Sequence, residues 1–434
     1  MFEHLEILNP KRTTGVPCGQ ASWYPYYPGF SYTFAQKLIA STQLKTNGCI
    51  IDPWNGSGTT TAAASVLGYN TKGFDLNPVM VITAKARILS RRERSRLWSI
   101  AAEMIDKAKC NEFHDLIDGS DPLIEWFIPQ SSSCLRGIEN SIQLLLVDTK
   151  YQRLPDQNYI DNLSNIAAFF YLALFRTVRK TLKRFFPTNP TWIKKPKDNS
   201  VRLRPDLRTL LSMFETEIHA MINAIHDNTI DCRTHNGEVY IKVASSDSLP
   251  LEDKSVDLVL TSPPYCTRID YAVATMSELA ILGYSSDGSF RKLRGQLIGT
   301  STLSDASPLP LPDWGPTCNK FLNQLEQHKS KASKSYYYKN HVQYFDAIFR
   351  SVGEMHRSLA NKGLGVIVIQ DSFYKEVHND LPRVFIEMAS AYGLDLGRRE
   401  DFCILRTMAR INPRVRKYRQ EVGATESVLC FIKN

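Results

Sequence analysis

Residues 255–265 read SVDLVLTSPPY, and this stretch decides how the rest of the chain can be arranged. Its first half is apolar and β-branched, which predicts a buried strand. Pro263 and Pro264 cannot donate to a sheet ladder, so the chain must leave the sheet after Thr261. In open α/β sheets, ligands bind outside the carboxyl ends of the strands. The stretch therefore predicts a ligand site that offers a hydroxyl, carbonyls and an aromatic ring. The alternative is a strand end without a ligand, followed by a proline turn and a core tyrosine, which would have the same sequence pattern.

A second strand end lies upstream, where residues 48–64 read GCIIDPWNGSGTTTAAA. The apolar letters predict a short buried strand, and the small residues from 59 to 67 predict a helix that can pack closely on a sheet. Gly56 and Gly58 lie in the turn between the two. A lone Gly-x-Gly is weak evidence, but here it joins a strand to a helix. Glycine at such a turn lets a ligand approach the backbone, and the helix start offers free N–H groups.

Acidic residues follow two further predicted strands. Asp75 ends the strand in residues 71–75, roughly 20 residues past the glycines, where a nucleoside-binding fold places a carboxylate on the ribose hydroxyls. The alternative is that Asp75 only caps the helix expected from Pro78. The strand at 240–244 is followed by Asp247, which could accept a hydrogen bond from the exocyclic amine of a purine or could equally cap a turn.

From residue 88 to about 232 the pattern is mostly helical, and one part of it is unusually basic. Basic side chains interleaved with aromatics in a proline-broken loop suit a phosphate backbone. A solvated basic surface is the alternative for any one of them. The candidates for nucleic-acid binding are Arg176, Arg179, Lys180, Lys183, Arg184, Lys194, Lys195, Lys197, Arg202 and Arg204.

The rest of the chain predicts the second half of a sheet. Residues 285–340 show little periodicity, and we expect an irregular, functional or mobile stretch there. A helix is expected at 342–360, a buried strand at 366–369 and a helix at 381–392, and the runs 402–405 and 427–432 could pair as an antiparallel edge. The predicted fold is α/β, a Rossmann-like, doubly wound, mostly parallel sheet with an antiparallel C-terminal edge and a helical inserted domain. We expect boundaries at 1–87, 88–234 and 235–434.

Composition bounds the class of protein. At 434 residues the chain is long for one domain, and 43% hydrophobic with 22% charged residues is ordinary for a globular protein. No apolar run is long enough to span a bilayer, and no secretory signal is visible. The nine cysteines include no Cys-x-x-Cys pair, which argues against a zinc site and fits a reducing cytoplasm. The net charge of +9 suits a polyanionic partner.

Together these stretches resemble the S-adenosylmethionine-dependent DNA amino-methyltransferases. The segment 52–60 (DPWNGSGTT) looks like their cofactor loop, 261–265 (TSPPY) like their catalytic tetrapeptide with its preceding residue, and 26–31 (YYPGFS) like their aromatic cofactor motif. The resemblance covers roughly residues 1–85 and 235–434, and Trp54 departs from the family's usual Phe. It implies S-adenosyl-L-methionine as cofactor, bound by Phe30, Asp52, Trp54, Gly56, Gly58, Thr59, Thr60, Asp75, Asn77, Asp247 and Ser248. The implied catalytic residues are Ser262, Pro263, Pro264 and Tyr265.

The resemblance also implies a substrate. The cofactor loop precedes the basic region and the catalytic motif follows it, as in the branch with its target-recognition region in between. We expect double-stranded DNA as partner and a flipped base as target. Ser262 at the first motif position favours cytosine N4 over adenine N6. An RNA or protein amino-methyltransferase and a non-catalytic nucleic-acid binder are the alternatives. A restriction-modification or other defence-system partner and the oligomeric state are left open.

Overall fold

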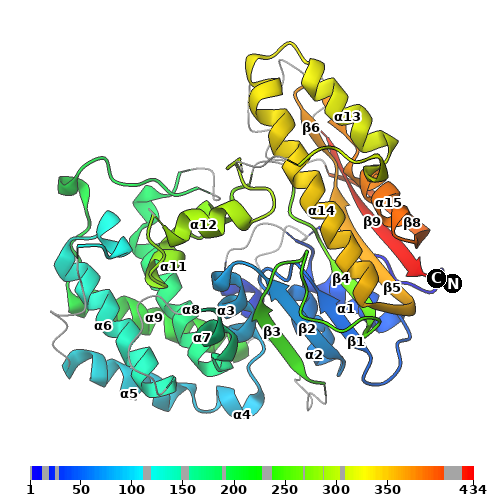
Figure 1. Cartoon of the computed structure of the whole chain (residues 1–434). Coiled ribbons are helices and arrows are strands. Elements are labelled where there is room, and N and C mark those ends of the chain that lie inside the picture. The colour runs from blue at the N-terminus through cyan, green and yellow to red at the C-terminus, as the bar shows by residue number, and fades with distance from the viewer. Residues whose placement is uncertain are drawn as a thin grey trace.

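A seven-stranded, mostly parallel sheet organises the molecule (Figure 1). The computed structural model describes residues 2–11, 19–24, 29–110, 119–147, 156–187, 192–226, 237–266, 269–286, 288–303, 308–404 and 423–434. In spatial order the strands are β3 (Val239–Val243), β2 (Asn70–Asp75), β1 (Cys49–Asp52), β4 (Val256–Thr261), β5 (Leu359–Gln370), β9 (Ala424–Lys433) and β8 (Leu394–Ile404). Strands β3 to β5 run parallel, whereas β9 is antiparallel to both its neighbours. The Rossmann-like fold and its antiparallel C-terminal edge are confirmed.

The order of the strands reverses between β1 and β4. From β1 the chain builds outward through β2 to β3, and then returns to place β4 on the other side of β1. Such a reversal leaves a crevice at the carboxyl ends of the two central strands, which is where doubly wound sheets bind ligands. The two motif-bearing strands are therefore direct neighbours, with Ile50 opposite Leu258 and Ile51 opposite Val259.

Alternating side chains bury both faces of the sheet. On β5, Val366 and Val368 pack with α1 (Tyr32–Ser41) and α2 (Thr59–Val66). Ile367 and Ile369 point the other way, into a cluster with α13 (Pro316–Gln327), α14 (Tyr338–Ser358) and α15 (Leu381–Ala391). This period of two explains why the strand reads as a continuous apolar run.

A helical lobe lies beside the β3 edge of the sheet (Figure 1). Its helices are α4 (Arg91–Arg94), α5 (Leu97–Cys110), α6 (Pro129–Leu146), α7 (Gln157–Asn162), α8 (Asn165–Thr181) and α9 (Leu207–His226). Helix α8 is buried over most of its length, and one hydrophobic cluster joins the lobe to α3 (Pro78–Arg87) and α11 (Met276–Ile281). Because that cluster crosses residue 87, the boundaries of the three regions stay a prediction.

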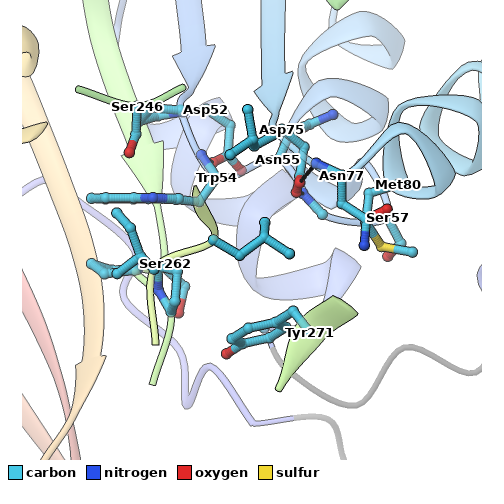
Figure 2. A pocket seen from close by; sticks show the side chains of 18 of the residues that line it. Asp52, Trp54, Asn55, Ser57, Asp75, Asn77, Met80, Ser246, Ser262 and Tyr271 are labelled. Carbon is cyan, nitrogen blue, oxygen red and sulfur yellow. Dashed lines mark hydrogen bonds between the residues drawn. The ribbon is translucent and has the colours of Figure 1, made fainter. Parts of the chain in front are cut away.

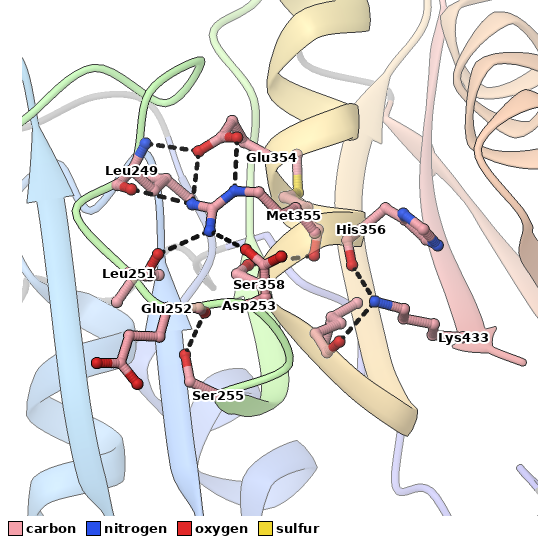
Figure 3. Close-up of polar contacts among 12 residues, drawn as sticks. Leu249, Leu251, Glu252, Asp253, Ser255, Glu354, Met355, His356, Ser358 and Lys433 are labelled. Atoms are coloured by element: carbon pink, nitrogen blue, oxygen red, sulfur yellow. Dashed lines mark hydrogen bonds and ion pairs between the residues drawn. The ribbon is translucent and has the colours of Figure 1, made fainter.

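At the amino edge of the sheet, polar contacts fix the approach to β4 and β5 (Figure 3). The Arg357 guanidinium donates to the carbonyls of Leu249 and Leu251 and to the carboxylates of Glu354 and Asp253, at 2.7–3.1 Å. The Lys433 ammonium, at the end of β9, donates to the carbonyls of His356 and Leu359. These contacts tie the end of α14 to the segment that enters β4, and the end of β9 to the start of β5.

The stretch 285–340 was expected to be irregular, and this prediction was wrong for much of it. It contains α12 (Ser289–Gln296), α13 and a π-helical turn, Ser333–Tyr337. The buried positions of α13 are Cys318, Phe321, Leu322 and Leu325, which is a helical spacing that the prolines and serines around it concealed. In the part of the chain that the structure describes, no helix has the length and apolarity needed to cross a bilayer.

Candidate functional site

A cavity opens where β1, β2 and β4 end (Figure 2). It contains about 1260 Å³ of space free of atoms, a figure that includes open solvent at its mouth. The predicted cofactor-binding residues on its wall are Phe30, Asp52, Trp54, Gly56, Thr59, Asp75 and Asn77. Ser262, Pro263 and Pro264 of the catalytic motif line the same cavity. Residues 26–28 of the aromatic motif lie outside the described residues.

Asp52 joins the two loops. Its carboxylate accepts hydrogen bonds from the hydroxyl of Thr261, at 2.5 Å, and from that of Thr60, at 2.6 Å. It also accepts from the backbone N–H of Trp54 at 3.1 Å. Burial raises the pKa of Asp52 to about 6, and these hydrogen bonds work against the rise. Thr60 is fully buried and absent from the cavity wall, so its contact is with Asp52 rather than with a ligand.

Asp75 is held at the end of β2 by two backbone N–H groups, those of Gly56 at 3.0 Å and Asn77 at 2.8 Å. Burial raises its pKa to about 7, and the nearby charge of Asp52 adds to the rise. A carboxylate that is desolvated in this way gains from a ligand that donates hydrogen bonds to it. Vicinal hydroxyls of a ribose are donors of that kind.

The two glycines of the turn, Gly56 and Gly58, are needed for different structural reasons. Gly56 has φ of 49° and presents its N–H to Asp75. Gly58 has φ of 83°, and a Cβ there would lie 2.8 Å from the Cβ of Ala84 in α3. Gly58 is not on the cavity wall. It permits close packing of the helices, whereas Gly56 shapes the ligand side.

Two buried donors on the cavity wall lack partners among the described residues. They are the indole Nε1 of Trp54 and the amide Nδ2 of Asn55. A buried donor without a partner costs about 1–3 kcal/mol, so such groups mark places where a ligand or water completes the structure. Figure 2 shows Trp54 beside Ser262, on the opposite side from Asp75 and Asn77.

The catalytic motif is braced by two tyrosines that belong to none of the sequence motifs. Tyr344 donates its hydroxyl to the Pro264 carbonyl at 2.9 Å, and the N–H of Tyr265 donates to the Tyr271 hydroxyl at 3.1 Å. Tyr271 also lines the cavity. No hydrogen bond among the described residues occupies the Ser262 hydroxyl.

The side chain of Tyr265 turns away from the cavity and is only 7% exposed. Its hydroxyl donates to Glu426 of β9 at 3.3 Å, and the ammonium of Lys11 lies 5.8 Å from the ring centroid. Lys11 also pairs with Glu426 at 3.5 Å. Glu426 is 161 residues from Tyr265 and carries no local motif, so sequence reasoning had no signal for it.

Asp247 and Ser248 lie off the wall of this cavity. The Asp247 carboxylate pairs with Arg350 and accepts from the Ser245 hydroxyl. The residues of this segment that do line the cavity are Ala244, Ser245 and Ser246. A role for Asp247 and Ser248 in cofactor binding stays a prediction.

The basic candidates divide into two groups. Arg176 and Lys180 both pair with the buried Glu217, and Arg179 pairs with the buried Glu278 at 2.8 Å. These charges hold α8 against its neighbours. Arg184 donates to the carbonyl of Val201, and Lys195 pairs with Glu125 at 2.7 Å. The remaining candidates with exposed side chains are Lys183, Lys194, Lys197 and Arg204, and Arg202 is half-buried.

Comparison with known proteins supports the resemblance found in the motifs. The chain is 26% identical over 290 residues to Type II methyltransferase M.BsoBI from Geobacillus stearothermophilus, covering 63% of this chain. It is 24% identical over 282 residues to Type II methyltransferase M.AvaI from Nostoc sp., and it spans about half of either relative, 54%. No family model matches the chain.

Two solved structures overlap with most of the chain. One is a SAM-dependent methyltransferase from Methanosarcina mazei, with TM-score 0.28 and 8% identity, covering 91% of this chain and 96% of that one. The other is geranyl diphosphate methyltransferase in complex with GPP and sinefungin, with TM-score 0.33 and 7% identity, covering 93% and 78%. Scores this low carry no argument about a common fold, and the fold of this chain follows from its own sheet order.

Proposed function

We propose that this chain transfers a methyl group from S-adenosyl-L-methionine to the exocyclic amine of a base in duplex DNA. The observation that carries the proposal is the Thr261–Asp52–Thr60 contact, which brings the cofactor loop and the Ser-Pro-Pro-Tyr motif to one cavity. The relatives named Type II methyltransferases support the same activity. Their type fits a restriction-modification role in the cytoplasm.

The residues present fit the cofactor. Asp75 offers a desolvated carboxylate to the ribose hydroxyls, Gly56 gives close access to the backbone, and Trp54 and Asn55 present buried donors without partners among the described residues. Phe30 and Trp54 provide flat walls. When bound there, S-adenosylmethionine supplies an electrophilic methyl group on a sulfonium.

The motif residues act on the target amine. Its lone pair is delocalised into the base, and acceptors aimed at the N–H groups reduce that delocalisation. The Ser262 hydroxyl and the Pro263 carbonyl supply such acceptors at the rim, and a fixed geometry contributes much of the rate. Tyr271 and Tyr344 keep the loop in place through their bonds to the neighbouring residues. No cysteine nucleophile is required.

Tyr265 would receive the extruded base against its ring. Lys11 lies over that ring in the structure, a cation–π contact that is worth about 0.5–2 kcal/mol. Base–aromatic stacking returns about 1–3 kcal/mol. Stacking can therefore offset the lost cation–π contact when a base replaces Lys11, which must then also leave its pair with the buried Glu426.

Cytosine N4 is the favoured target because Ser262 opens the motif, and adenine N6 is the second candidate. The test is methyl transfer from labelled cofactor to duplex DNA, with RNA and protein as parallel substrates, followed by mapping of the modified bases. We expect label in DNA and none with Ser262→Ala. Label in RNA or protein alone would establish one of the rival methyltransferases. Cofactor and DNA binding without transfer would indicate a non-catalytic binder.

A further inference from the structure

An exposed, lysine-rich turn joins α13 to α14 at the carboxyl edge of the sheet. Its lysines are Lys329, Lys331, Lys334 and Lys339, all with exposed side chains. Lys334 pairs weakly with Glu326 at 3.5 Å. The other three make no ion pair within the described residues. Four positive charges within eleven residues therefore face solvent with little local compensation.

The turn is a rigid platform, unlike most solvated charge runs. Residues Ser333–Tyr337 form a π-helical turn, a rare geometry that is frequent at functional sites. Below it, the Tyr337 ring packs 4.6 Å from the ring of Tyr374, whose hydroxyl is 2.7 Å from that of Ser330. The buried Ser333 hydroxyl donates to the Leu325 carbonyl at 2.6 Å. These contacts hold the turn in place, while Lys329, Lys331 and Lys339 make no ion pair within the described residues.

The platform is attached to the loop that adjoins the catalytic motif. Tyr336 donates its hydroxyl to the Ser301 carbonyl at 2.7 Å, and the Asn340 amide donates to the Thr300 carbonyl at 2.8 Å. The preceding residue, Gly299, lies so close to the motif that a Cβ there would be 3.4 Å from the Tyr265 carbonyl oxygen. One layer of chain separates the lysine turn from the proposed base site.

The arrangement also places the turn opposite the helical lobe. Figure 1 shows α13 and the start of α14 extending past the carboxyl edge of the sheet, with α12 between them and the lobe. The nucleotide that carries an extruded base stays joined to the phosphates on either side of it. When the base enters the site, the DNA strand must therefore pass close to the rim of the cavity. The tyrosines of the turn are turned inward and at least partly buried, which leaves a charged rather than an apolar surface. Such a surface suits phosphates.

We propose that the turn from Lys329 to Lys339 contacts the DNA phosphates that flank the target base. This inference rests on the proposed function and names a second wall of the DNA site, opposite the basic lobe. Contacts to phosphate fix the position of the duplex and carry no sequence information. Replacing these lysines should therefore weaken binding equally for all sequences.

The test compares two double variants of the full chain. Lys329→Gln with Lys331→Gln removes two charges from the turn. The matched control, Lys254→Gln with Lys362→Gln, removes two exposed lysines from the amino edge of the sheet. Affinity for labelled duplexes of two unrelated sequences is measured between about 50 and 200 mM salt, where each phosphate contact contributes about 0.9 to the slope of log K against log salt.

We expect the turn variant to reduce that slope by about 1.8, for both duplexes alike, and the control to leave it unchanged. Thermal unfolding of both variants should match that of the unaltered chain. If the unaltered chain methylates DNA while the turn variant keeps its full salt slope, the inference is wrong and the proposed function stands. If the loss is confined to one duplex, the lysines read bases and the inference is again wrong. If the unaltered chain neither binds nor methylates duplex DNA, both proposals fail together.

Discussion

The cavity and the helical lobe use their charged residues in opposite ways. In the cavity, Asp52 is buried and Asp75 is half-buried, and among the described residues both are held by hydroxyls or backbone N–H groups and by no cation. Both have raised pKa values. In the lobe, Arg136 is fully buried, yet it contacts two carboxylates, those of Asp121 and Glu139, at 2.6–3.0 Å. The lobe neutralises its charges internally, whereas the cavity leaves its acids to be satisfied by a ligand.

This difference separates structural from functional charge. A buried carboxylate that lacks a cation is costly, and the fold keeps it where a ligand can offset the cost. A buried ion network in which the cation meets carboxylates of the same lobe holds elements together and needs no ligand as a partner for that cation. Replacements in the lobe should therefore change stability, and replacements at the cavity should change binding and turnover.

The largest effect is expected from breaking the lobe network. Arg136→Met leaves Asp121 and Glu139 buried without a cation, and losing one partner of a buried pair costs about 3–5 kcal/mol. Urea unfolding followed by circular dichroism measures the change. The control is Lys107→Met, which removes an exposed pair with Glu103 and should cost under about 1 kcal/mol. Equal decreases in the free energy of unfolding of the two variants would mean that the buried network stabilises the lobe no more than an exposed ion pair does.

The catalytic motif gives the next largest effect. Tyr265→Ala should lower kcat by roughly 100-fold, because a base without its stacking surface is misplaced. Affinity for S-adenosylmethionine should stay nearly unchanged, since Tyr265 is not on the wall of the cavity. Turnover and calorimetric binding are measured on the same preparation.

Glu426 sharpens this test, because it touches only the tyrosine and Lys11 among the groups at the motif. Glu426→Gln preserves an acceptor for the Tyr265 hydroxyl and should retain most of the turnover, whereas Glu426→Ala should approach the tyrosine variant. An equal loss of cofactor binding in any of these variants would contradict the separation of the two roles.

A pH dependence of intermediate size is expected at Asp75. Its pKa is about 7 in the folded chain, raised by burial, and ribose hydroxyls donate to the ionised form. Cofactor affinity should therefore fall about tenfold as the pH is lowered from about 8 to 6, as the carboxylate takes up a proton. The sign for folding is opposite: a raised native pKa means that this group's contribution to stability decreases as pH rises from about 4 to 7. Asp75→Asn should bind weakly and without this pH dependence, and calorimetry at several pH values is the measurement.

The sequence predicted the local parts of the site because each is a strand followed by a turn. Each of the two motifs, DPWNGSGTT and TSPPY, contains the residues that shape its own loop. Their positions at strand ends could be predicted from the apolar pattern of the preceding strand and from the glycines or prolines that end it. The contacts that join those loops were not predictable in the same way. Glu426, Tyr344 and Lys11 reach the motif from distant segments, and nothing near them in sequence indicates it.

The basic region shows the same limit. Its charges are evident in composition, but whether a given arginine faces solvent or a buried glutamate depends on partners such as Glu217 and Glu278, which lie about 40 and 100 residues away along the chain. Counting charges predicted a DNA-binding surface, and only the packing of α8 separates Arg176 and Arg179 from the exposed lysines.

The smallest effect should come from the exposed lysines of the lobe. Replacing Lys194, Lys195 and Lys197 together by Gln should weaken DNA binding and lower the salt slope by about 0.9 for each phosphate that is no longer neutralised. Lys195 already pairs with Glu125, so we expect a decrease that corresponds to about two phosphates rather than three. Because these side chains are exposed, stability should change by less than about 0.5 kcal/mol.

The matched variant for this last comparison is Arg179→Gln. It breaks a pair with the buried Glu278 and should reduce stability without altering the salt slope, since its charge is neutralised inside the protein. Arg179 also lines the cavity, so cofactor affinity is measured beside the slope. If Arg179→Gln lowered the slope and the triple lysine variant did not, the DNA path would run along α8 rather than along the loop. The division between internal and exposed charge in the lobe would then have to be redrawn.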